Sequence, residues 1–270
     1  MQPEFSPAST WTSTQLCDLL NACFVGYSVP VSFSEPVFTR RFSAESVCLA
    51  DSGVWLANGE PVAVGLVARR GWHARLAAFA VAEPWRGKKI AKPCLEKLFD
   101  GIREQGARTL CLEVLANNMP AIRLYQSFGF QITQRLMGFI APHEGNNAGA
   151  QQLDETCDPR LLLVKVYADG LVSLPWMLAP ETLCGLPCKV WVLGHSVAVV
   201  SELGGVPQLR FIFTDPAFRG QGEACALLLS LAWHYPHLTS VVSVPEYLAA
   251  LFVRAGYRPL PIVQYEMSVD

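Results

Sequence analysis

The chain has 270 residues, a length that favours two domains at about 150 residues per domain. Its 21 Lys and Arg residues nearly balance its 23 Asp and Glu residues, which argues against a dominant attraction to nucleic acid or an anionic membrane. Hydrophobic residues make up 51 %, which excludes a disordered chain, and the apolar stretches are too short or too interrupted to span a membrane. We therefore expect a core-rich cytoplasmic protein without nucleic-acid or membrane partners. The high fraction of hydrophobic residues is also compatible with a homodimer.

The nine cysteines are odd in number and irregularly spaced, which fits a reducing compartment. Cys184 and Cys188 have no second pair to complete a zinc site, and His234 and His237 are likewise isolated. Buried thiols that act as small hydrophobic side chains are the simpler interpretation. No metal site is expected.

Helices and strands alternate in the first half of the chain. Apolar residues from Leu16 to Phe24 recur with helical spacing after N-cap candidates at 12–14. Asn58-Gly59 between two apolar runs predicts a hairpin, because a type I′ turn needs positive φ at both positions. In chain order the predicted elements are a helix over 16–24, strands over 54–57, 61–69 and 75–81, a helix over 90–102, a strand over 109–115, a helix over about 120–128 and a strand over 131–140.

The second half repeats this order after a polar, Gly- and Ala-rich linker at 141–152. A strand at 161–166 could close the first domain or open the second. The predicted elements that follow are strands over 190–193, 197–203 and 208–214, a helix over 224–234, a strand over 240–244, a helix over 246–255 and a strand near 262–267.

The two halves align on short motifs. Arg86-Gly87 falls on Arg219-Gly220, each between a predicted strand and a predicted helix, and Gly129 falls on Gly256 at the end of a later helix. Two copies of one α/β unit explain the length of the chain. We predict a first domain at 1–150 and a second, shorter domain at 151–270.

Each Arg-Gly pair marks a strand, a tight turn and an immediate helix, which is the layout of an anion site. The first N–H groups of a helix lack intrahelical acceptors and lie at the positive end of its macrodipole. Lys88, Lys89 and Lys92 crowd this turn in the first half, where cations are unfavourable unless an anion is bound. The turn therefore predicts a phosphate or pyrophosphate ligand, with plain surface charge as the alternative.

Two separated motifs resemble those of the GNAT superfamily of N-acetyltransferases. Its pyrophosphate loop, Arg/Gln-x-x-Gly-x-Gly/Ala, is matched throughout by residues 219–224 (RGQGEA) and, except for Lys89 in place of Gly, by residues 86–91 (RGKKIA). Its second signature is matched by residues 118–130 (NMPAIRLYQSFGF), and Leu112-Glu113-Val114 is similar to a strand of ribosomal-protein N-terminal acetyltransferases. The resemblance covers about 54–140 well and 190–267 more loosely.

The resemblance implies an α/β fold with a mixed sheet, built as two tandem GNAT-like acyl-CoA N-acyltransferase domains. It implies that the parallel strands over 77–81 and 110–115 splay apart, so that the first pairs with the pantetheine arm of acetyl-CoA as an added strand would. The implied cofactor-binding residues of the first domain are Phe79, Ala80, Val81, Arg86, Gly87, Lys88, Lys89, Ile90, Ala91, Lys92, Asn118 and Tyr125.

By the same resemblance, the reaction is transfer of an acetyl group to a primary amine of a small molecule or of a protein N-terminus. Glu113 matches the position of the base that takes the amine's proton, and Tyr125 matches that of the acid for the departing thiolate. Each residue has a structural alternative. Tyr125 could be a core aromatic residue, Glu113 a side chain facing water, and Asn118 a helix-start residue.

The second copy has the better pyrophosphate loop but carries Phe252 where the first has Tyr125, so we place the active site in the first half. Lys89 in the first loop is tolerable if the backbone there is helical. The alternatives are a non-catalytic CoA-binding sensor or interaction protein, and catalysis by the second half with His195 or Tyr247 as the proton donor. The residues of a second cofactor site would be Arg219, Gly220, Gln221, Gly222 and Ala224.

Overall fold

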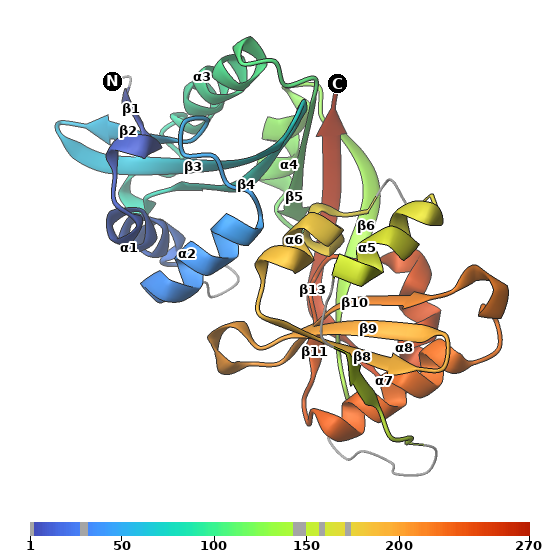
Figure 1. The fold of residues 1–270 in the computed structure, drawn as a ribbon. Coiled ribbons are helices and arrows are strands. Elements are labelled where there is room, and N and C mark those ends of the chain that lie inside the picture. Colours follow the sequence, from blue (N-terminus) through green and yellow to red (C-terminus); the bar gives the residue numbers. More distant parts are fainter. Residues whose placement is uncertain (1–2, 28–31, 143–149, 157–159, 171–173) are drawn as a thin grey trace. The chain divides into compact units, whose positions relative to one another are not determined.

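The computed structural model describes residues 3–27, 32–142, 150–156, 160–170 and 174–270. The chain forms two compact units (Figure 1). Unit 1 comprises Met1–Glu113, Met119–Gln131 and Met267–Asp270, and unit 2 comprises Val114–Asn118 and Ile132–Glu266.

The units do not divide the chain at residue 150, the boundary predicted from the sequence. Strand β6 (Gln131–Ile140), predicted to end the first domain, pairs with β11 (Thr239–Ser240) and with β12 (Val244–Pro245). Phe139 on β6 also stacks on Phe252, with ring centroids 4.4 Å apart. Strand pairing and core packing, rather than position along the chain, therefore place this strand in unit 2.

Unit 1 has the sheet order β1-β2-β3-β4-β5, antiparallel except for the parallel pair β4 and β5. Its strands are β1 (Glu4–Pro7), β2 (Gly53–Ala57), β3 (Glu60–Arg70), β4 (His73–Val81) and β5 (Thr109–Leu115), whose last two residues belong to unit 2. Its helices are α1 (Ser13–Phe24), α2 (Glu35–Ala44), α3 (Ala91–Glu104) and α4 (Met119–Gln126), with short 3₁₀ helices η1 (Ala8–Thr10) and η2 (Glu83–Trp85).

Local sequence accounts for where these elements begin and turn. The Thr12 side chain accepts a hydrogen bond from the Gln15 backbone N–H at 3.2 Å, and the Gln15 side chain accepts one from the Thr12 N–H at 2.9 Å. This capping box starts α1. The hairpin between β2 and β3 turns at Asn58 (φ 54°) and Gly59 (φ 81°), as a type I′ turn requires. The predicted helix and hairpin are confirmed.

Helices cover both faces of the unit 1 sheet (Figure 1). Val64 and Leu66 on β3 pack with Leu16 of α1 in one buried cluster, which α2 joins. Gly65, between them, points to the opposite face, where a Cβ would lie 2.9 Å from a methyl group of Leu98 on α3. Because side chains alternate along a strand, α1 and α2 lie against one face and α3 against the other.

Unit 2 has the sheet order β13-β6-β11-β10-β9-β8-β7. Its further strands are β7 (Asp154–Thr156), β8 (Cys188–Leu193), β9 (Ser196–Ser201), β10 (Gln208–Thr214) and β13 (Arg258–Val269), whose last residues belong to unit 1. Its helices are α5 (Arg160–Ala168), α6 (Pro180–Gly185), α7 (Glu223–His234) and α8 (Ala249–Arg254), with 3₁₀ helices η3 (Trp176–Leu178), η4 (Leu203–Gly205), η5 (Pro216–Phe218) and η6 (Glu246–Leu248).

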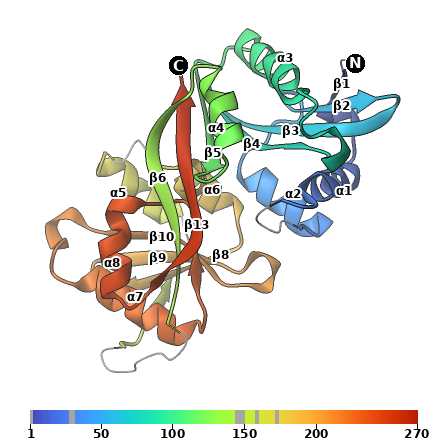
Figure 2. The ribbon, with the colours of Figure 1, turned by 180° about the vertical axis from the view of Figure 1, so that it is seen from behind.

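Consecutive residues of β9 belong to the two cores of unit 2. Val199 packs in one cluster with Leu162 of α5 and Leu183 of α6. Val200 packs in the other with Leu227 of α7 and Phe252 of α8. The helices α5 and α6 therefore cover one face of this sheet, and α7 and α8 cover the other (Figure 2).

Some elements differ from the sequence predictions. Residues 161–166, predicted as a strand, lie in helix α5 of unit 2, where the buried Leu162 and Val166 stand four residues apart, as on one helix face. The predicted strand over 240–244 is interrupted between β11 and β12. No pattern predicts β1, α2 or β7, and most of the predicted linker, 143–149, lies outside the described residues. Within the described ranges, no helix is both long and apolar enough to cross a membrane.

Candidate functional site

Strands β4 and β5 part in unit 1 as the resemblance implied. Their parallel pairing runs from His73 and Thr109 to Leu76 and Leu112 and ends there, whereas β4 continues to Val81. A register shift in the pairing with β3 marks a bulge at Ala77, where the separation begins. The last residues of β4, among them the predicted Phe79, Ala80 and Val81, therefore extend past the ladder with β5.

Unit 2 shows the same separation of two parallel strands at a bulge. β10 pairs in parallel with β11 only at Gln208 and Leu209, and a register shift against β9 marks a bulge at Arg210. This bulge precedes Arg219 by nine residues, as Ala77 precedes Arg86. The repeat predicted from the Arg-Gly pairs therefore extends to the strands before them.

The two Arg-Gly loops have nearly the same backbone. Each follows a short 3₁₀ helix, η2 or η5, and the φ and ψ angles are −64° and 146° at Arg86 and −64° and 149° at Arg219. The next residues, Gly87 and Gly220, have φ of 74° and 80°. Positive φ is accessible to glycine without the Cβ clash of other residues, which explains the glycine in both copies.

The Arg86 side chain shapes the loop from within the protein. Its Nε donates to the Val81 carbonyl at 3.1 Å, and its Nη2 donates to the carbonyls of Cys23 and Val25 at 2.7 and 2.8 Å. In the second copy, Arg219 Nε donates to the Thr214 carbonyl at 3.0 Å. These bonds occupy the arginine side chains. An anion would therefore be contacted by the loop's backbone N–H groups, the first turn of α3 and the neighbouring lysines.

Lys89 does not have the helical backbone that would make a lysine tolerable at this position. Its φ is 61°, in the left-handed region, as is that of Gly222 at the matching position (89°). The loop therefore has the backbone conformation that glycine favours, although a lysine occupies this position. A side chain in this region carries a steric cost of about 1–2 kcal/mol.

Lys89→Gly is expected to stabilise the protein by about 1 kcal/mol, because it removes this strain. Urea denaturation followed by circular dichroism measures the change. Lys88→Gly is the matched control, since Lys88 does not have positive φ and its ammonium lies 4.8 Å from the centroid of the Trp85 ring. That control should destabilise the protein; equal effects of the two substitutions would contradict the assignment of strain to Lys89.

The remaining loop residues lead into α3. Ile90 is the buried N-cap residue, and the helix begins at Ala91. Lys92 lies in the first turn and is exposed. The N–H groups of this turn have no intrahelical acceptors, so they and Lys88, Lys89 and Lys92 are the groups that could hold a phosphate.

Tyr125 lies on α4, which starts directly after Asn118. The Tyr125 side chain is buried, and its ring packs edge-on against Phe130 with centroids 6.0 Å apart. Burial, with a smaller contribution from Tyr27, raises the pKa of the Tyr125 hydroxyl. The hydroxyl is therefore protonated at neutral pH and can serve as a proton donor. The core packing foreseen as an alternative is also present.

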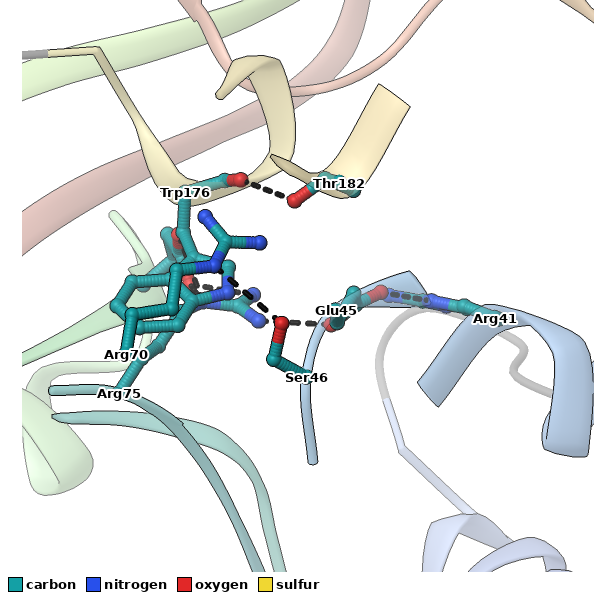
Figure 3. A network of polar contacts seen from close by, with 8 residues as sticks. Arg41, Glu45, Ser46, Arg70, Arg75, Trp176 and Thr182 are labelled. Atoms are coloured by element: carbon teal, nitrogen blue, oxygen red, sulfur yellow. Dashed lines mark hydrogen bonds and ion pairs between the residues drawn. The ribbon is translucent and has the colours of Figure 1, made fainter. Parts of the chain in front are cut away.

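Glu113 lies in a buried ion network rather than facing water. Figure 3 shows the part of this network formed by Arg75, Glu45 and Arg41. Arg75 Nε lies 3.1 Å from one Glu113 carboxylate oxygen and 2.8 Å from the other. Arg75 Nη1 also donates to Glu45 at 2.7 Å, and Glu45 accepts from Arg41 Nε at 2.7 Å. Burial raises the pKa of Glu45, but the charges of Arg41 and Arg75 outweigh it, so that its net pKa is lowered.

The partners of Glu113 were missed in the sequence. Arg75 and Glu113 are single charges in otherwise apolar strands, and such a pair of opposite charges is the signal that could have identified them. Glu45 directly follows α2, a helix that no pattern predicted. The network joins α2, β4 and β5, the elements beside the predicted site.

The second copy surrounds a cavity of about 470 Å³ in unit 2. Arg219, Gly220, Gly222 and Ala224 of the loop line it, and Gln221 does not. Glu223 also lines it, but its carboxylate accepts from the His195 backbone N–H at 2.8 Å and lies 3.0 Å from His195 Nδ1. The alternative donor Tyr247 lines the cavity as well, with 76 % of its surface exposed.

Residues 13–130 match the sequence model of the acetyltransferase (GNAT) family. This match covers less than half of the chain, and over that segment the predicted resemblance to the GNAT family is confirmed. A 59-residue stretch is 44 % identical to the uncharacterized N-acetyltransferase YycN of Bacillus subtilis, and it spans 22 % of this chain and only 38 % of that protein.

Two solved structures share the fold of this chain over nearly its whole length. A GCN5-related N-acetyltransferase of Sphaerobacter thermophilus is 16 % identical to this chain. The match covers all of this chain and 96 % of that protein's chain, with a TM-score of 0.67. A tandem GNAT protein from the clavulanic acid biosynthesis pathway is 12 % identical and covers 99 % of this chain and 98 % of its own, with a TM-score of 0.68. The predicted tandem GNAT fold is confirmed.

Proposed function

We propose that this GNAT protein transfers an acetyl group from acetyl-CoA to a primary amine, and that unit 1 carries the reaction. The observation that carries the proposal is that unit 1 contains three features together. The end of β4 leaves its ladder with β5, the Arg86 loop and the start of α3 follow it, and Tyr125 provides a protonated hydroxyl on α4. The acceptor is an amine of a small molecule or of a protein N-terminus.

The residues of unit 1 fit acetyl-CoA in both charge and backbone. Peptide-like amides of the pantetheine arm can pair with β4 at Phe79–Val81, as an added strand does. The N–H groups at Gly87–Lys92 can bind the pyrophosphate, with Lys88, Lys89 and Lys92 as counter-charges and Asn118 as a further contact. The left-handed backbone at Lys89 supports this fit, because it retains the shape that a glycine would allow.

Acetyl-CoA supplies the activated thioester carbon that the amine attacks. Tyr125 then donates its hydroxyl proton to the departing sulfur, and its raised pKa keeps that proton in place beforehand. The amine's proton needs an acceptor, for which we propose Glu113. Because both Glu113 oxygens are close to Arg75, this base would work while paired with a guanidinium.

Acetyl-CoA binding is expected to raise the free energy of unfolding by about 2.7 kcal/mol at a hundredfold excess over its Kd. Titration calorimetry on the full chain gives the affinity, which Lys88→Ala with Lys92→Ala should weaken. Lys97→Ala, an exposed lysine farther along α3, is the matched control and should bind normally. Release of the CoA thiol with a panel of amines separates transfer from binding alone. The proposal would be refuted if millimolar acetyl-CoA neither bound to the protein nor stabilised it.

A further inference from the structure

The ion network at Glu113 alternates in sign along its length. From α2 to β5 the charged side chains are those of Arg41, Glu45, Arg75 and Glu113, and ion pairs of 2.7, 2.7 and 2.8 Å join each to the next. Figure 3 shows Glu45 between Arg41 and Arg75. The net pKa of Glu45 lies below its ordinary value, so its carboxylate is ionised at neutral pH. Two cations and two anions therefore leave this network without net charge.

The inner part of the network has almost no contact with water. The side chains of Glu45, Arg75 and Glu113 are only 1 %, 5 % and 6 % exposed. A further charge that lacks a counter-charge is strongly unfavourable in such surroundings. An ammonium ion at Glu113 would be such a charge, because Arg75 already neutralises that carboxylate. A neutral amine would leave the network balanced.

Glu113 can still accept a hydrogen bond from a neutral amine. A carboxylate has about four acceptor positions on its two oxygens. Arg75 Nε lies 3.1 and 2.8 Å from these oxygens, and Arg75 Nη2 lies 2.8 Å from one of them. This fork uses part of the acceptor capacity, and the rest can accept an amine N–H.

We propose that unit 1 admits its acceptor as a neutral amine, and that it therefore favours weakly basic amines, such as an amine beside a carbonyl group, over alkylammonium ions. This inference rests on the acetyl transfer proposed for unit 1 and specifies its class of substrate. Arg75 and Glu45 are specificity-determining residues, because they set the charge that an acceptor meets at Glu113.

The neutral form of the amine also fits the proposed step. The nitrogen lone pair forms the C–N bond, the C–S bond breaks, and the sulfur takes its electron pair and the Tyr125 proton. The nitrogen becomes acidic only as the C–N bond forms, so a carboxylate paired with a guanidinium suffices to accept its surplus proton. Return of this proton from Glu113 to the Tyr125 oxygen through solvent restores both groups, and the products are an amide and the CoA thiol.

The pH dependence of kcat/KM shows in which form the acceptor binds. Ethylamine and glycinamide are small primary amines that represent an alkylamine, with a pKa of about 10.4, and an α-amine, with a pKa of about 7.7–8.0. Their neutral fractions differ about 300-fold at about pH 7, and the greater nucleophilicity of neutral ethylamine offsets part of this difference, so glycinamide should be preferred about 10–100-fold. From about pH 7 to about pH 9, kcat/KM for ethylamine should rise about tenfold per pH unit, and the preference for glycinamide should fall about tenfold.

Two glutamine variants change the charge of the network in opposite directions. Arg75→Gln leaves an excess negative charge, so ammonium ions should be accepted and the ethylamine profile should flatten. Glu45→Gln leaves an excess positive charge and should keep the rise with pH. A merely structural role of the network would affect both profiles alike. Cys111→Ala removes the thiol beside Arg75 and should also keep the rise, which excludes titration of that thiol as its source.

The wild-type profile decides the matter even if Arg75→Gln does not fold. A flat ethylamine profile of the wild type, or equal profiles of folded Arg75→Gln and Glu45→Gln, would overturn the inference while the acetyl transfer stands. Transfer to neither amine by a protein that binds acetyl-CoA would instead overturn the transfer proposed for unit 1, and the inference with it.

Discussion

Arg75→Met is expected to lower the free energy of unfolding by about 3–5 kcal/mol. Met fills much of the space of the Arg75 side chain, so the effect comes from charge rather than from a large cavity. The substitution leaves the buried carboxylates of Glu45 and Glu113 without the guanidinium that bridges them at 2.7 and 2.8 Å. A buried charge that loses its partner costs more than the pair contributes. Urea denaturation at neutral pH measures the loss.

The pH dependence of stability provides an independent check on this network. The pKa of Glu45 is lowered in the folded protein, so its ion pairs stabilise the wild type above the ordinary value of 4.5 and this contribution is lost as the pH falls. In Arg75→Met, Glu45 keeps only its ion pair with Arg41, so less stability is lost as the pH falls. The difference in stability between the two proteins should therefore shrink on acidification.

Two control variants separate this network from general effects of removing a cation. Arg75→Met with Glu113→Gln removes one of the stranded charges and should recover part of the lost stability. Arg103→Met changes an exposed arginine at the end of α3 and should cost less than about 1 kcal/mol. If Arg75→Met is no more destabilising than Arg103→Met, the network contributes nothing to folding.

Tyr125→Phe is expected to lower kcat by at least about tenfold, because general acid–base catalysis typically contributes about 10²–10⁴-fold. The ring that packs against Phe130 remains, so folding and acetyl-CoA affinity should change little. Only the proton for the departing thiolate is lost. Steady-state kinetics on an accepted amine, together with calorimetry of acetyl-CoA binding, measure the two effects.

Tyr257→Phe makes the same chemical change in unit 2. Tyr257 is buried like Tyr125, and its hydroxyl donates to the Leu228 carbonyl at 3.0 Å. Its loss should cost about 1 kcal/mol of stability and leave kcat unchanged. Full activity of Tyr125→Phe on the accepted amine would remove Tyr125 from the mechanism.

Local patterns in the sequence determined most elements of the fold and the two loops. The Asn58-Gly59 turn, the capped helix after Thr12 and the strand at 109–115 depend on neighbouring residues, so short windows of sequence predict them. The repeated Arg-Gly pair likewise predicted two similar strand–loop–helix units. The substitution of Phe252 for tyrosine already distinguished the second copy from the first.

Only the tertiary structure decided which distant residues meet. Glu113 is paired with Arg75 because β4 and β5 lie in parallel, and Glu45 joins them from the end of α2, a helix that no local pattern predicts. β6 belongs to unit 2 because its pairing partners lie there, and 161–166 is helical because it buries Leu162 and Val166 on one face. Strand pairing and burial join residues far apart in the chain, and no window of sequence contains that information.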